Sequence, residues 1–144
     1  MKKRIIIGLI LVSLIVVLQV SAYAENGGSI PLNKILQKLT KSNNTSLQRL
    51  DLSNQFKGEI VNGSGRVKDV IHSFGEDNKA MVYLSKPYKS KEYEIILLAD
   101  IESAETIQKG NKIKFEGNFV GTTYQTLRFE NAEITLCKSW WWPF

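Results

Sequence analysis

A long run of strand-forming residues extends from Phe56 to Ile71, with alternating positions from Gly65 onward, and this pattern predicts a long β-strand. The two sides of the strand would carry Gly65, Val67, Asp69 and Ile71 on one and Arg66, Lys68 and Val70 on the other. Gly63 and Gly65 interrupt the pattern, and glycines within a strand indicate a bulge or a sharp bend. We therefore expect one bent strand that pairs with two different partners.

Four further strands and one helix are predicted downstream of this stretch. The strands are Ala80–Leu84, Tyr93–Ala99, Lys112–Val120 and Thr126–Leu136, with turns at Gly75–Asn78 and Gly121–Thr123. The run from Ile95 to Leu98 is wholly apolar, as expected for a strand covered on both faces. Apolar residues recur every third position between Asp100 and Gly110, which predicts a short helix, and a parity shift near Glu130–Asn131 predicts a bulge.

Two helical segments are predicted before the first strand. In the first, Ser29 caps the helix and Pro31 lies in its first turn, while Ile35, Leu36 and Leu39 share the apolar face. The second begins at Thr45 or Ser46 and ends at Gly58. Its inward residues are expected to be Leu47, Leu50 and Phe56.

The order of these elements is that of an OB-fold: three strands, a helix, then two strands. We expect a mainly β protein whose five-stranded Greek-key barrel has a short helix between strands three and four and follows an N-terminal helical lead-in. The segments GSGRVKDV, IQKGNKIKFEG and LRFENAEI resemble the OB-fold family called tRNA_anti-like, found in many small exported bacterial proteins of unassigned role. The resemblance covers Phe56 to Leu136 and implies the fold but no catalytic residue.

Residues 1–24 have the three parts of a cleavable signal peptide: a basic start, an apolar run from Ile5 to Val20, and Ala22-Tyr23-Ala24 at the cleavage site. The alternative is an uncleaved anchor, although the apolar run is shorter than the ~20 residues of a spanning helix. The predicted domains are the signal peptide (1–24), the helical lead-in (25–55), the OB domain (56–137) and an aromatic tail (138–144). We expect a periplasmic or secreted protein.

Charge gives little support for a nucleic-acid ligand. The whole chain has a net charge of +5, but Lys2, Lys3 and Arg4 belong to the predicted signal, so the mature chain carries about +2. The single cysteine, Cys137, excludes an internal disulfide and leaves either a buried thiol or a bridge between chains.

No catalytic, metal or cofactor site is predicted. His72 is the only histidine, no nucleophile-elbow motif is present, and the carboxylates of Glu92 and Glu94 fit a solvated strand edge better than a glycosidase pair. We therefore expect no enzymatic activity. The alternative within the same fold is a small secreted nuclease-type hydrolase.

The predicted ligand-binding residues are aromatic side chains and a lysine in the region that OB barrels use for recognition: Tyr83, Tyr88, Lys89, Tyr93 and Tyr124. The alternative is that Tyr83 and Tyr93 pack inside the barrel while the nearby lysines solubilise a loop. An envelope protein or a glycan suits the predicted location better than nucleic acid, which we do not expect as a ligand.

The C-terminal tail carries a second predicted contact surface, formed by Trp140, Trp141, Trp142 and Phe144. Three adjacent tryptophans cannot all enter one small core, so they would bind a partner, lie at a membrane interface or cap the barrel. The sequence thus predicts an exported, non-enzymatic OB-fold binding module. A toxin B-subunit-like oligomer that binds glycans is a further alternative, and the oligomeric state stays open.

Overall fold

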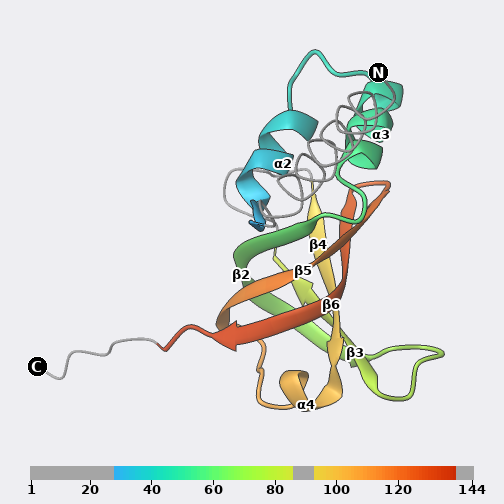
Figure 1. Cartoon of the computed structure of the whole chain (residues 1–144). Helices are drawn as coiled ribbons and strands as arrows, with labels where there is room; N and C mark the ends of the chain where they lie inside the picture. The colour runs from blue at the N-terminus through green and yellow to red at the C-terminus, as the bar shows by residue number, and fades with distance from the viewer. Residues whose placement is uncertain (1–27, 86–92, 139–144) are drawn as a thin grey trace, which may run out of the picture.

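The computed structural model describes residues 28–85 and 93–138 of the 144-residue chain, and Figure 1 shows their arrangement. Its elements are β1 (Ile30–Pro31), α2 (Leu32–Leu39), α3 (Ser46–Gln55), β2 (Ile60–His72), β3 (Lys79–Leu84), β4 (Glu94–Asp100), α4 (Ile101–Ala104), β5 (Lys112–Thr123) and β6 (Thr126–Leu136). The predicted signal peptide, the ligand residues Tyr88 and Lys89, and the tail aromatics Trp140, Trp141, Trp142 and Phe144 lie outside the described residues.

The long strands close into a five-stranded barrel with OB topology, which confirms the predicted fold class. The strands follow one another around the barrel as β2, β3, β4, β6 and β5, and β5 then pairs with β2. All these pairs are antiparallel except β4–β6, which is parallel. The two-residue β1 adds a parallel edge to the start of β2.

The predicted bend in the first long strand is confirmed, because β2 pairs with β5 from Ile60 to Arg66 and with β3 from Val67 to His72. Its glycines provide space for close packing. A Cβ at Gly63 would lie 2.9 Å from the Phe115 ring, and one at Gly65 would lie 2.8 Å from Leu84 Cδ1. The predicted parity of the strand is wrong beyond Val67, because a bulge before Asp69 lets Val70 pack against the core.

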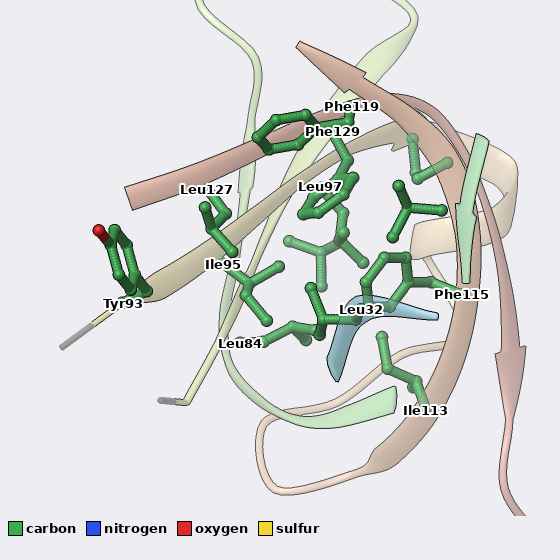
Figure 2. Packing of buried hydrophobic residues seen from close by; sticks show 14 of the residues in the cluster. Leu32, Leu84, Tyr93, Ile95, Leu97, Ile113, Phe115, Phe119, Leu127 and Phe129 are labelled. Atoms are coloured by element: carbon green, nitrogen blue, oxygen red, sulfur yellow. The ribbon is translucent and has the colours of Figure 1, made fainter. Parts of the chain in front are cut away.

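The core fills the barrel and is formed by alternate residues of every long strand (Figure 2). Three phenylalanines occupy its centre: the Phe129 ring lies 5.3 Å from Phe115 and 5.4 Å from Phe119, both tilted. Tilted rings at this separation are favourable aromatic pairs. The buried face of α2 extends the same core at one end of the barrel through Leu32, Ile35, Leu36 and Leu39.

The helices lie at the two ends of the barrel, α2 and α3 at one and α4 at the other (Figure 1). Ser29 does not cap α2 as predicted. The N-cap is Pro31, which makes no side-chain cap bond, and the Ser29 hydroxyl instead accepts a 2.6 Å hydrogen bond from the Asn62 amide. Of the residues predicted to face inward from α3, Leu47 and Leu50 are 68% and 49% exposed, whereas Phe56 at the helix end is buried in the core as predicted.

The second half of the chain differs from prediction in two local features. The predicted helix from Asp100 to Gly110 is only four residues long, because Ile107 N–H bonds to the Ala104 carbonyl three residues back and so continues as turns. The predicted turn at Gly121–Thr123 belongs to β5, and Tyr124, with φ of +53°, begins the actual turn. The predicted bulge near Glu130–Asn131 is confirmed. Within residues 28–85 and 93–138, none of the helices has the length and apolar character that crossing a membrane requires.

Candidate ligand-binding surface

An apolar surface covers the outside of the barrel on β2, β3 and β4. It forms two cross-strand rows: Ile71 pairs with Met81, which pairs with Leu98, and Tyr83 pairs with Ile96. The five side chains, called the apolar strip below, are Ile71, Met81, Tyr83, Ile96 and Leu98. None belongs to the core cluster inside the barrel.

Strand alternation explains why these residues face outward. Their immediate neighbours Val82, Leu97 and Ala99 belong to the core, and successive side chains of a strand point to opposite faces. Leu98 is only 4% exposed, whereas the other members of the strip are half-buried. The prediction that β4 is covered on both faces therefore holds at Leu98 but not at Ile96, which keeps part of its surface exposed.

Ion pairs border the apolar strip at both ends. At one end the Lys68 ammonium donates a hydrogen bond to Glu94, and at the other the Lys79 ammonium donates one of 2.8 Å to Asp100. These carboxylate partners raise the pKa of both lysines above the ordinary value. Along the β6 side, Arg128 Nη2 lies 3.8 Å from Glu130 Oε1. In the described chain, each of the three cations beside the strip is therefore paired with a carboxylate.

Each of the two barrel loops next to the strip exposes one aromatic side chain. Phe74, in the loop between β2 and β3, is 91% exposed, and Tyr124, in the turn between β5 and β6, is 98% exposed. These connections correspond to the two loops with which OB barrels contact ligands. The strip thus lies between two loops that present apolar groups to solvent.

The structure separates the tyrosines that the sequence grouped into one site. Tyr83 belongs to the apolar strip, but Tyr93 is 4% exposed and packs in the core cluster, at whose edge Figure 2 shows it. Tyr93 and Tyr124 line the same cavity, of ≈ 370 Å³, between α3 and the β5–β6 turn. The predicted set is therefore divided between the outer sheet face and this cavity.

The candidate chemical groups lie apart from one another. His72 ends β2 and borders a cavity of ≈ 240 Å³ beside α4, where its neighbours are mostly aliphatic. Glu94 is paired with Lys68, and Glu92 lies outside the described residues. Within the described ranges, no three His, Cys, Asp or Glu side chains are grouped so that they could hold a metal ion. The absence of enzymatic activity stays a prediction.

Sequence reasoning missed most of the apolar strip. Ile71, Met81, Ile96 and Leu98 were assigned to the interior or given no role, and Phe74 was given no role. The signal that could have found them is the continuous apolar run of β4. A strand at the side of a small closed barrel has only one face on the core, so its alternate apolar residues must lie outside.

Comparison with known proteins supports the fold alone. No family model matches the chain, and no curated protein matches it, so the resemblance to the tRNA_anti-like family stays a prediction. Among solved structures, the chain is similar to a "putative nucleic acid-binding lipoprotein" from Klebsiella pneumoniae subsp. pneumoniae MGH 78578. The two share 13% sequence identity with a TM-score of 0.57 over 75% of this chain and 91% of the other.

Proposed function

We propose that this chain is an exported, non-enzymatic binding module of the cell envelope that binds a partner protein through the apolar strip. The observation that carries the proposal is the position of the strip on β3 and β4. These are strands two and three of the OB barrel, the face with which such barrels bind ligands. Apolar groups held half-open on a rigid sheet offer contact area that a partner can bury.

The charges around the strip favour a protein over a nucleic acid. The bordering cations are Lys68, Lys79 and Arg128, and the bordering anions are Asp69, Glu94, Asp100 and Glu130. Binding to a polyanion depends on unpaired cations that neutralise phosphates. Among the described residues, the border has more acids than bases and its cations are paired, so this part of the border offers little of that driving force.

The composition of the strip also favours a protein. Surfaces that bind single-stranded nucleic acid stack successive bases on aromatic rings, whereas the strip has one aromatic residue, Tyr83, and four aliphatic ones. A glycan presents many hydroxyl groups that need hydrogen-bonding partners, and aliphatic side chains supply none. An apolar patch on another protein matches the strip better than either ligand.

Export and the lack of catalysis are further parts of the proposal. The basic and apolar start of the chain with its Ala22-Tyr23-Ala24 site supports export, and the word lipoprotein in the name of the Klebsiella pneumoniae structure agrees with an envelope location. The strip itself offers contact area and one phenol but no acid and base pair.

The test is affinity capture from envelope extracts, followed by titration of the captured protein against purified variants. Ile96→Lys places a charge in the middle of the strip, and Leu47→Lys makes the same kind of change at an exposed leucine on α3. We expect Ile96→Lys to weaken binding of the captured protein at least about tenfold, as for a charge placed at the centre of an interface. Leu47→Lys should bind like wild type.

An oligonucleotide titration distinguishes the alternative suggested by the name of the Klebsiella pneumoniae structure. If the strip binds a protein, Ile96→Lys lowers protein binding and, by adding a cation, does not lower oligonucleotide binding. The proposal fails if Ile96→Lys leaves capture unchanged while circular dichroism shows both variants to be folded. It also fails if Ile96→Lys abolishes binding of an oligonucleotide that wild type binds.

A further inference from the structure

A cavity of ≈ 240 Å³ opens at the α4 end of the barrel, and we call it the α4 cavity. Its aliphatic lining residues are Val70, Ile71, Ala80, Ile101, Ala104 and Ile107. Two of them are alanines, whose short side chains leave space that longer ones would fill. An apolar cavity of about 150 Å³ can hold a benzene ring, so this one has room for the side chain of a phenylalanine or a leucine.

The α4 cavity is continuous with the apolar strip. Ile71 lines the cavity and is also a member of the strip, where it pairs with Met81. His72 lines the cavity as well, and Phe74, two residues beyond it, is 91% exposed. A partner protein that covers the strip at Ile71 therefore also reaches the cavity.

Exposed carboxylates surround the α4 cavity. Segments 72–79 and 100–107, which contain the β2–β3 loop and α4, carry five exposed acids: Glu76, Asp77, Asp100, Glu102 and Glu105. The Ile101 N–H donates a 3.1 Å hydrogen bond to the Asn78 carbonyl, so the two segments lie side by side. Glu105 lines the cavity, and Glu102 lies one turn earlier on the same side of α4. The cavity is thus an apolar hollow with an acidic rim.

The acidic rim determines which charge a ligand of the α4 cavity should carry. Segments 72–79 and 100–107 contain one lysine, Lys79, and it is paired with Asp100. Among the described residues, the other four acids of the rim form no salt bridge. Such a rim attracts cations and repels the phosphates of nucleic acid and of anionic lipid. It also disfavours a second copy of this chain, because a two-fold interface would bring the same acids together.

We propose that the partner of the apolar strip presents a basic segment, in which an apolar side chain flanked by lysine or arginine enters the α4 cavity. This inference rests on the proposed function, because it names the chemistry of the protein that the strip binds. The cavity buries the apolar side chain, and the flanking cations meet Glu102 and Glu105. Burial of an apolar anchor supplies affinity, whereas charges at the rim supply specificity and faster association.

The experiment titrates the peptide KKGFGKK into isotope-labelled protein recovered after export and follows the backbone amides by NMR. The peptide KKGAGKK lacks the apolar anchor, and EEGFGEE has the opposite flanking charge, so both parts of the proposal are tested without altering the protein. Glu102→Lys/Glu105→Lys reverses two charges of the rim. Asp51→Lys/Glu59→Lys makes the same change in net charge at exposed positions near the other end of the barrel, where α2 and α3 lie.

KKGFGKK should shift the amides of His72, Ala104 and Ile107 and saturate. Binding should weaken at least about tenfold for KKGAGKK, because the buried phenyl group is lost. It should weaken roughly fivefold or more in Glu102→Lys/Glu105→Lys and little in Asp51→Lys/Glu59→Lys.

Four results would overturn the proposal. The first is the absence of saturable shifts at millimolar KKGFGKK, and the second is equal affinity for KKGAGKK or EEGFGEE. The third is an equal loss in the two charge variants. The fourth is a dimer in sedimentation analysis that Phe74→Ala dissociates, because a second copy would then be the occupant of the cavity.

The protein captured from envelope extracts separates this inference from the proposed function. Both Ile96→Lys and Glu102→Lys/Glu105→Lys should weaken its binding. If only Ile96→Lys does so, the strip binds a partner without the cavity, and this inference alone fails. If KKGFGKK binds in the cavity while Ile96→Lys leaves the captured protein bound as to wild type, the proposed function fails instead.

Discussion

Replacing Gly63 with alanine tests how tightly the bent strand packs on the core. The added Cβ would lie 2.9 Å from Phe115 Cε1 and Cζ and 3.0 Å from Leu32 Cβ. Neither neighbour can move away easily. Phe115 is 3% exposed and its ring packs 5.3 Å from that of Phe129, while the Leu32 Cβ is fixed by the backbone of α2.

The magnitude follows from two opposing effects. Adding a methyl group to a filled core costs about 1–3 kcal/mol, and removing a glycine from a strand returns about 0.5–1 kcal/mol through lower backbone entropy of the unfolded chain. The free energy of unfolding should therefore fall by about 1–2 kcal/mol. For a domain of this size, the melting temperature should fall by roughly 5–10 °C.

Urea denaturation followed by far-ultraviolet circular dichroism measures this change. Ser64→Ala is the matched control, because Ser64 is the next residue on the same strand and its side chain is exposed. That variant should differ from wild type by less than about 0.5 kcal/mol. A Gly63→Ala protein as stable as Ser64→Ala would show that β2 does not pack against Phe115 and α2 as described.

Three further predictions concern other parts of the fold. Gly65→Val should destabilise more than Gly63→Ala, because the valine adds branches where a Cβ alone meets buried Leu84 at 2.8 Å; equal urea midpoints would contradict this packing. Thr45→Ala removes the capping box of α3, in which the Thr45 hydroxyl accepts a hydrogen bond from the Gln48 N–H. The free energy of unfolding should fall by about 1 kcal/mol, and an unchanged urea midpoint would contradict the cap. The hydrogen bond to Asp100 raises the pKa of Lys79 in the folded state. The stability that this ion pair contributes is therefore complete below the unfolded pKa of 10.5 and is lost as pH rises through the folded pKa. Plots of unfolding free energy against pH for wild type and Lys79→Met should run parallel from pH 6 to 9 and converge above pH 10.5.

The barrel topology was predictable because each long strand carries its own signal. β2 was recognised by alternation and by the glycines that later proved to be close-packing positions, and β5 by its alternating Ile113, Phe115 and Phe119. Once three strands, a short helix and two strands follow one another, few topologies remain, and the parallel β4–β6 pair is a consequence of the OB order.

Hydropathy predicted the buried face of α2, with Ile35, Leu36 and Leu39, but not that of α3. The side of α3 that meets the barrel is anchored by Ser53, which is 1% exposed and whose hydroxyl accepts a 3.1 Å hydrogen bond from the Thr122 hydroxyl. A polar contact between residues 69 positions apart produces no hydrophobic periodicity from which the buried face of α3 could be predicted. The leucines at positions 47 and 50 suggested the opposite face and proved to be exposed.

The candidate site could be only partly predicted. Tyr83 was selected because it lies in the region that OB barrels use, and the structure places it in the apolar strip. Its neighbours Met81 and Ile96 were not selected, since an apolar residue in a strand is usually assigned to the core. The bulge before Asp69, which brings Ile71 opposite Met81, depends on strand pairing and has no local signature.

Site-specific photocrosslinking in living cells tests the central claim most directly. A photoreactive benzoylphenylalanine replaces Tyr83 in the apolar strip or, as the control, the exposed Lys114 on β5. We expect position 83 to give one discrete crosslinked protein that is absent from position 114 and lost when Ile96→Lys is added. Capture of the same protein from both positions, or of nucleic acid from position 83, would contradict a protein-binding strip.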